Sequence, residues 1–265
     1  MDTEQTAKAA EAAEYLCRIA KTKSFDVVLV LGSGWGPAAD QIGETQFEIP
    51  ISDLPHFPTP TVAGHAGTVR TVVAGDKRLL VFLGRTHLYE GHGVNAVTHG
   101  VRVASAAGCR AIILTNGCGG LNPNWSPGTP VLIRDHINFT GTSPLEGANF
   151  VDLTDLYSPR LRALCRAIDP TLDEGIYVQF RGPMYETPAE IEMVRAIGGT
   201  LVGMSTTLEA ITARSLKMEI LGLSLVTNLA AGMSGKSLDH AEVLQAGRQS
   251  ASRMGKLLSD VVRTM

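Results

Sequence analysis

Short apolar runs alternate along the chain with longer segments whose apolar residues recur at helical spacing. The apolar runs have the length and the aliphatic or β-branched content of strands, which we predict at 26–31, 68–74, 78–83, 111–115, 131–134, 175–180 and 220–227. Between two of them, the Ala74–Lys77 stretch contains Gly75 and Asp76, residues typical of a tight hairpin turn. One antiparallel pair is therefore expected within an otherwise parallel sheet.

Helix starts are marked by capping residues. Thr187-Pro188-Ala189-Glu190 combines an N-cap, a proline suited to the first turn and the glutamate of a capping box. Asp239-His240-Ala241-Glu242 is similar and opens a long amphipathic segment, with Gly247 on its apolar face. An alanine-rich helix at the N-terminus and another at 96–107 complete the pattern. The predicted fold class is α/β, a mixed central β-sheet flanked by helices.

Composition narrows the class of protein. The 265 residues are 44% hydrophobic and no linker divides them, so we expect a single domain over 1–265. A net charge of −3 with scattered basic residues gives no footprint for nucleic acid. The charged segment 1–21 does not resemble a signal peptide, and 221–233 is too short and polar to span a bilayer. A cytoplasmic protein with no membrane partner is expected.

The cysteines and histidines lack metal-ligand spacing. Cys17, Cys109, Cys118 and Cys165 are far apart, without the paired pattern of a zinc site, so we expect reduced thiols and no metal. Cys109 and Cys165 lie in apolar surroundings and are expected in the core.

Polar or glycine residues follow several of the predicted strands. In open α/β sheets, ligands bind at the carboxyl ends of the strands, so these residues are expected to meet at one edge. The stretches that carry them are 31–36, 84–91, 115–120, 203–205 and 226–228. A hydroxyl, a cation, glycine-rich backbone and an amide gathered there suit a small anion beside a polar ligand.

The first two stretches favour an oxyanion. Glycines around Ser33 let backbone amides approach a ligand, although a plain tight turn fits the same pattern. Arg85 and His87 lie two apart, so their side chains share a face if the backbone stays extended. Arginine offers phosphate a planar fork of donors, and histidine adds another. A surface arginine beside a core histidine is the alternative.

Two further stretches complete the set of candidates. His65 lies between glycines, and the glycine-rich stretch after Asn116 predicts a second backbone loop behind a strand. The irregular segment from 138 to 156 is long for a compact domain and predicts a lid, a binding loop or a partner contact.

The motifs in order resemble those of trimeric purine nucleoside phosphorylases over residues 26–262. They are Leu-Gly-Ser-Gly from 31, Gly-Arg-x-His-x-Tyr-Glu-Gly from 84, Gly-Pro-x-Tyr-Glu-Thr-Pro-Ala-Glu from 182, Val-Gly-Met-Ser-Thr from 202 and Thr-Asn-x-Ala-Ala-Gly from 227. The resemblance implies a nucleoside phosphorylase fold, a homotrimer, and reversible phosphorolysis of purine nucleosides without a cofactor. Inorganic phosphate is then the co-substrate, and a ribose 1-phosphate is formed.

The resemblance also assigns roles residue by residue. Phosphate would be held by Ser33, His65, Arg85, His87, Ser205 and the amide of Gly117. The nucleoside would contact Tyr89 and Met204 at the ribose, His240 at the 5′-hydroxyl, and Tyr185, Glu186 and Asn228 at the base. Phe150 would reach into a neighbouring subunit's site. The catalytic set is then Arg85, His87, Glu186 and Asn228.

These assignments favour 6-oxopurine nucleosides, chiefly inosine and guanosine. Glu186 would accept from N1–H, which adenine lacks, and Asn228 can donate at N7 and O6. The chain departs from the family pattern at Gly117 and Cys118, where alanines are usual. A methylthioadenosine phosphorylase is the nearest alternative and a non-catalytic nucleoside-binding protein the alternative of another class. Asn228, Glu186 and the polar His240 argue against the first, which requires an apolar 5′ pocket, and a phosphate-dependent inosine cleavage assay would distinguish the second.

Overall fold

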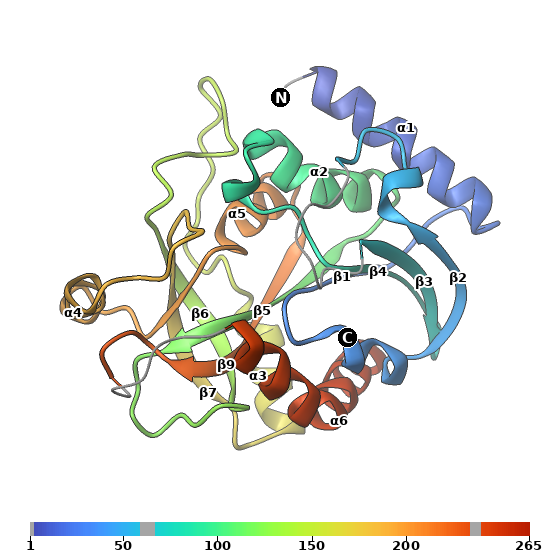
Figure 1. Cartoon of the computed structure of the whole chain (residues 1–265). Helices are drawn as coiled ribbons and strands as arrows, with labels where there is room; N and C mark the ends of the chain where they lie inside the picture. The colour runs from blue at the N-terminus through green and yellow to red at the C-terminus, as the bar shows by residue number, and fades with distance from the viewer. Residues whose placement is uncertain (1–2, 59–66, 234–239) are drawn as a thin grey trace.

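The computed structural model describes residues 3–58, 67–233 and 240–265. The strands, all of which lie in the first two of these ranges, form one nine-stranded sheet (Figure 1). The sheet order is β2-β3-β4-β1-β5-β8-β7-β6-β9, with a further pairing of β5 and β9. The strands are β1 Val27–Leu31, β2 Glu44–Pro50, β3 Thr68–Ala74, β4 Lys77–Leu83, β5 Ala111–Gly120, β6 Pro130–Asn138, β7 Asp173–Gln179, β8 Leu201–Gly203 and β9 Glu219–Leu229.

The sheet is mixed, which confirms the prediction. β1 runs parallel to β4 and β5, whereas β3 and β4 form the expected antiparallel hairpin, with Ala74 opposite Lys77. Pairings from β5 through β8, β7, β6 and β9 return to β5 and close a ring. The central strand β5 therefore touches β1, β8 and β9, and residues from distant parts of the chain meet along it.

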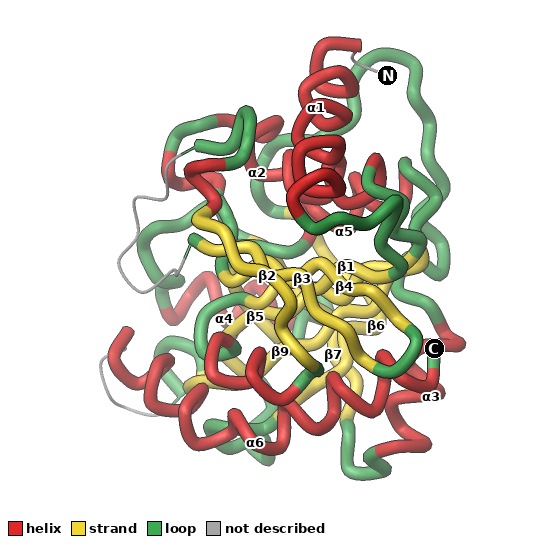
Figure 2. The backbone as a smooth tube through the Cα atoms, turned by 90° about the vertical axis from the view of Figure 1, so that its right-hand side faces the viewer, coloured by secondary structure: helices red, strands yellow, loops and turns green. Residues whose placement is uncertain are grey.

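Helices cover both faces of the sheet (Figures 1 and 2). Because side chains alternate along a strand, Val28 and Val30 of β1 pack with α1, α2 and α5, while Leu29 and Leu31 pack with α3 and α6 on the other face. This burial on both faces explains why β1 has no polar residue. The helices are α1 Thr3–Ile19, α2 Gly93–Ala106, α3 Pro159–Ile168, α4 Pro188–Ala196, α5 Thr207–Ser215 and α6 His240–Thr264.

The capping box predicted for α4 is present. Thr187 Oγ1 accepts from the amide of Glu190 at 3.2 Å, and the Glu190 carboxylate accepts from the amide of Thr187 at 2.7 Å. α6 begins at His240, and its expected cap, Asp239, lies outside the described residues. α6 packs against the turn after β1 so closely that a Cβ on Gly247 would lie 2.3 Å from the Cα of Gly34. Only glycine fits there, and this contact fixes the turn that carries Ser33.

Two strands and two helices were not predicted. β2 is an edge strand whose side chains are mostly exposed, so it has few apolar residues, and β8 has only three residues. α5 is buried from Thr207 to Ala213 and therefore has no polar face to reveal a helical period. α3 was overlooked although Ser158 caps it and Pro159 occupies its first turn. Strands buried on both faces were predicted well, whereas the exposed edge strand and the fully buried α5 gave little signal.

The cysteines lie as expected, since Cys109 and Cys165 are buried and all four thiols are free. In the part of the chain that is described, no helix combines the length and the apolar character needed to cross a bilayer.

Candidate active site

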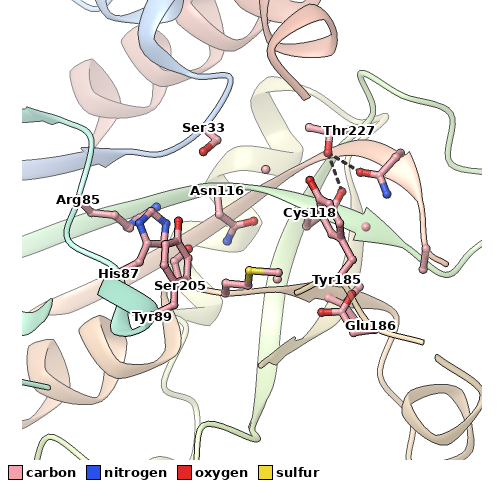
Figure 3. A pocket seen from close by; sticks show the side chains of 17 residues that line it. Ser33, Arg85, His87, Tyr89, Asn116, Cys118, Tyr185, Glu186, Ser205 and Thr227 are labelled. Carbon is pink, nitrogen blue, oxygen red and sulfur yellow. Dashed lines mark hydrogen bonds between the residues drawn. The ribbon is translucent and has the colours of Figure 1, made fainter. Parts of the chain in front are cut away.

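A pocket, partly open to solvent, lies where residues at or just after the C-terminal ends of β1, β4, β5, β8 and β9 come together. It is lined by Ser33, Arg85, His87, Tyr89, Asn116, Gly117, Cys118, Gly119, Tyr185, Glu186, Val202, Gly203, Met204, Ser205, Thr227, Asn228 and Ala230. Figure 3 shows Arg85, His87 and Ser205 gathered at one end and Tyr185, Glu186 and Thr227 at the other.

Arg85 supplies the cationic end of the pocket. Its side chain is only 3% exposed, because it follows β4 into the molecule and lies against α5. Nε donates to Glu209 at 3.1 Å and Nη1 donates to the carbonyl of Thr115 at 2.6 Å. Nη2 is buried and, within the described residues, has no hydrogen-bond partner. A buried donor on a cation needs an acceptor, so this atom indicates an anion site.

Backbone comes unusually close to Arg85. A Cβ on Gly32 would lie 2.6 Å from Arg85 Nη1 and 2.7 Å from the Thr115 carbonyl. The backbone at position 32 can therefore lie this close to Arg85 only because glycine has no side chain. Thr115 Oγ1 accepts from the amide of Gly32 at 3.1 Å and fixes this approach. Ser33, the next residue along, lines the same pocket as Arg85 and His87.

His87 and Tyr89 form a stacked pair, with ring centroids 4.8 Å apart. The backbone amide of His87 donates to Glu90 at 2.7 Å, and the imidazole Nδ1 lies 3.5 Å from the same carboxylate. Burial, together with the negative charge of Glu90, raises the pKa of Tyr89 to about 12, so its hydroxyl stays protonated and can donate. Arg85 and His87 both line the pocket, as their spacing predicted.

Ser205 is presented by a strained turn between β8 and α5. Thr206 adopts a φ of +82°, a region that residues with a side chain rarely occupy. Its hydroxyl accepts from Asn116 Nδ2 at 2.9 Å and lies 3.2 Å from Ser205 Oγ. Asn116 Oδ1 is buried and unpaired among the residues described.

The glycine-rich stretch after Asn116 is part of β5, which corrects the predicted loop. Its backbone stays extended because β9 pairs with it throughout and β8 joins at Gly119 and Gly120. A register shift between Cys118 and Gly119 bends the strand at the pocket. Gly117 still lines the pocket, as predicted, and Cys118 lies beside it with 3% exposure. Burial raises the pKa of the Cys118 thiol to about 12.

A carboxylate supplies the opposite end of the pocket. Glu186 precedes the cap of α4 and is 9% exposed, and its Oε1 has no partner in the described part of the chain. Burial raises the pKa of Glu186, with a smaller contribution from the charge of Glu190. Its neighbour Tyr185 is 41% exposed at the rim, and Met204 lines the wall between the two ends.

Asn228 lies near the end of β9 with its amide already oriented. Oδ1 accepts from Thr227 Oγ1 at 2.9 Å, and Nδ2 donates to the carbonyl of Leu229 at 2.9 Å. The Thr227 hydroxyl also lies 3.2 Å from the carbonyl of Cys118, an acceptor that links β9 to β5 (Figure 3). One hydrogen of Nδ2 remains available to the pocket.

Of the predicted site residues, two lie outside what the structure describes and a third does not line this pocket. His65 lies outside the described residues, and the side chain of His240 is likewise not described. Phe150 is 94% exposed and does not line the pocket, although it lies in the irregular segment that was predicted.

Sequence reasoning missed two groups that shape the site. The side chain of Asn116 and the carboxylate of Glu209 each contact a residue far away in the sequence. Glu209 carries one local signal, since Thr206 and Glu209 have the spacing of a capping box, and that box is present. Nothing local indicates that the same carboxylate also binds Arg85.

The fold and the pocket fit a glycosyl-transferring phosphorylase better than a dinucleotide- or nucleoside triphosphate-binding protein. The sequence profile of the Phosphorylase superfamily matches residues 26–263, and the chain belongs to this family. A purine nucleoside phosphorylase of Cellulomonas sp is 55% identical over 257 residues, covering 95% of this chain and 91% of that protein. The purine nucleoside phosphorylase of Mycobacterium tuberculosis is 56% identical over 237 residues, covering 89% and 88%.

Solved structures agree. Isoform 2 of purine nucleoside phosphorylase from Schistosoma mansoni, in complex with cytosine and ribose-1-phosphate, superposes with a TM-score of 0.89 at 31% identity. The alignment covers 98% of this chain and 96% of that one. The mixed α/β architecture predicted from the sequence is thereby confirmed.

Proposed function

We propose that this protein is a purine nucleoside phosphorylase that cleaves inosine and guanosine with inorganic phosphate. One observation carries the proposal. The pocket is lined by Arg85, whose buried Nη2 has no hydrogen-bond partner among the described residues, and by Glu186, whose buried Oε1 likewise has none. The arginine N–H can donate to an anion, and the carboxylate oxygen can accept from an N–H group. A 6-oxopurine nucleoside lying between them, with phosphate beside Arg85, provides both.

The phosphate would lie against Arg85 Nη2, with His87, Ser33, Ser205 and the Gly117 amide as further donors. All five residues line the pocket. Because two of Arg85's three nitrogens are already bonded, phosphate would meet one fixed nitrogen rather than a free fork. His65 is assigned here by family resemblance alone.

The purine would lie against Tyr185, with Glu186 accepting from N1–H and, in guanine, from the exocyclic amino group. Adenine has no N1–H and would leave the desolvated carboxylate without a partner, which disfavours adenosine. Asn228 Nδ2 would donate to N7 or O6. Tyr89 and Met204 would contact the ribose, and His240 its 5′-hydroxyl.

In the reaction the C1′–N9 bond breaks and its electron pair passes into the purine, while a phosphate oxygen bonds to C1′. The purine gains negative charge as the sugar becomes cationic. Asn228 meets the first charge with a donor, and phosphate held by Arg85 faces the second. The purine then takes a proton and leaves as the free base, and ribose 1-phosphate remains. The chain's own groups supply these steps without a cofactor.

The proposal includes a homotrimer in which Phe150 completes the site of a neighbouring subunit. Its support is the family resemblance, and the side chain of Phe150, 94% exposed, is accessible to a neighbouring subunit.

The test is cleavage of inosine, guanosine, xanthosine and adenosine with and without phosphate. We expect base release only with phosphate and only weakly from adenosine. Equal rates in phosphate-free buffer would instead indicate a hydrolase, and binding without turnover a nucleoside-binding protein. Arg85→Ala should raise the KM for phosphate far more than the KM for inosine.

A further inference from the structure

Glu209 is a buried carboxylate in the third position of α5, on the far side of Arg85 from the pocket. Its side chain is 3% exposed. Its two oxygens lie 3.1 and 3.0 Å from Arg85 Nε, and one of them also accepts from the amide of Thr206 at 2.9 Å. A single carboxylate therefore holds both the cation and the turn that presents Ser205.

The arginine is fixed from two directions. Nε donates to Glu209 and Nη1 donates to the Thr115 carbonyl, whereas Nη2 is buried and has no partner among the described residues. A guanidinium is rigid and planar, so these two contacts determine where Nη2 points. Beyond the ion pair lies a small cavity lined mainly by apolar side chains, among them Phe57, Phe82 and Val97.

The turn before α5 depends on the same carboxylate. Thr206 at a φ of +82° stores strain, which persists only where surrounding contacts hold it. Those contacts are Glu209 at the Thr206 amide and Asn116 at the Thr206 hydroxyl. If the turn relaxed, Ser205, the next residue back along the chain, would move relative to Arg85.

We propose that Glu209 is a positioning residue for phosphate: it keeps Arg85 Nη2 and Ser205 in register for one oxyanion. The inference rests on the proposed function, since it presumes that phosphate binds at this end. Glu209 does not contact phosphate, because its oxygens face Nε and the Thr206 amide. It acts through the two groups that do.

Glutamine at this position would be nearly the same size but unable to replace the carboxylate. Its one oxygen can serve Arg85 Nε or the Thr206 amide, and its NH₂ group would then face the other donor. Removing the negative charge would, by Coulomb's law alone, strengthen phosphate binding to Arg85. Positioning and simple charge repulsion thus predict opposite signs for the change in phosphate affinity.

The experiment compares Glu209→Gln with Glu190→Gln in the full-length enzyme. Both remove the carboxylate of a helix capping box, but Glu190 caps α4 and contacts no residue of the phosphate end. We expect Glu209→Gln to raise the phosphate KM about tenfold or more, the scale of a lost charge-assisted hydrogen bond, with the inosine KM changed less than about threefold. Glu190→Gln should leave the phosphate KM unchanged.

The shift in Tm caused by phosphate provides a second measure of phosphate binding, one that does not depend on turnover. Phosphate alone should raise the Tm of the wild type and of Glu190→Gln, and raise it much less for Glu209→Gln. If Glu209→Gln does not fold, Glu209→Asp keeps the charge but, being one methylene shorter, should show the same separation of phosphate from inosine KM.

The outcomes separate the two proposals. A phosphate KM that is unchanged or lower in Glu209→Gln, or one that rises in equal measure with the inosine KM, would overturn the positioning role. Inosine cleavage by the wild type that does not need phosphate would instead overturn the proposed function.

Discussion

Replacing Asn228 by aspartate should change which purine the enzyme accepts. In the wild type, Nδ2 donates to the Leu229 carbonyl at 2.9 Å and keeps one hydrogen for the base, while Oδ1 accepts from Thr227 Oγ1. An ionised aspartate keeps the contact with Thr227 but sets its other oxygen against the Leu229 carbonyl and against N7 and O6 of a 6-oxopurine. Acceptors would then face acceptors at every remaining contact.

The magnitude follows from the number of partners lost. Inosine loses one donor in a largely desolvated pocket, which costs about 1 to 3 kcal/mol, or about 5- to 150-fold in kcat/KM. Adenosine can instead give its 6-amino group to the new carboxylate and regain part of that loss. The ratio of inosine to adenosine kcat/KM should therefore fall by up to about 5- to 150-fold, the equivalent of about 1 to 3 kcal/mol. Adenosine remains a poor substrate in absolute terms, because Glu186 still lacks an N1–H partner.

The assay is release of base from both nucleosides at saturating phosphate, in the wild type, Asn228→Asp and Thr227→Val. Thr227→Val is the matched control, because it removes the hydroxyl that orients the amide while leaving the amide in place. It should lower both activities with little change in their ratio. A ratio within twofold of the wild type in Asn228→Asp would refute the assignment of Asn228 to base recognition.

Three further changes test other parts of the site. Burial raises the pKa of Glu186, so binding of inosine should weaken as pH falls through that raised value and the carboxylate gains a proton; Glu186→Gln should flatten this acid limb in the inosine KM without altering the phosphate KM. Phe150→Ala should raise the nucleoside KM while the Tm stays near the wild-type value, and a fully active monomer in sedimentation would contradict the shared site. Iodoacetamide near neutral pH should label the half-exposed Cys17 before Cys118, because the pKa of the Cys118 thiol is about 12 and it is buried; peptide mass spectrometry showing Cys118 labelled first would contradict its place in the wall.

The sequence predicted the parts of the fold whose signal is local. Strand β1 is apolar on both faces because both faces are covered, and the cap of α4 is written in four consecutive residues. The edge strand β2 and the fully buried α5 have no such pattern, since one is mostly exposed and the other has no exposed face. A local sequence pattern reveals an element when one of its faces is buried and the other exposed, or when a cap marks its start. In β2 and α5 the two faces differ little in exposure.

The same limit applies to the site. Arg85 and His87 were recognisable because they lie two apart after a strand, whereas the partner of Arg85 lies 124 residues further along the chain. The stretch after Asn116 was predicted as a loop because glycines usually end strands, but pairing with β9 on one side and β8 on the other keeps it extended. Both errors concern contacts between segments that lie far apart in the chain.

In the proposed function, Glu186 and Asn228 would act at different stages of the reaction. Glu186 would contact N1–H equally before and during bond cleavage, so its interaction contributes mainly to binding. In the proposed reaction Asn228 would face the atoms on which negative charge grows, so its hydrogen bond would strengthen as C1′–N9 lengthens and would contribute mainly to the rate. Truncating Glu186 should thus appear chiefly in the inosine KM and truncating Asn228 chiefly in kcat. Their side chains come from the segment before α4 and from β9, so each contribution can be altered without moving the other.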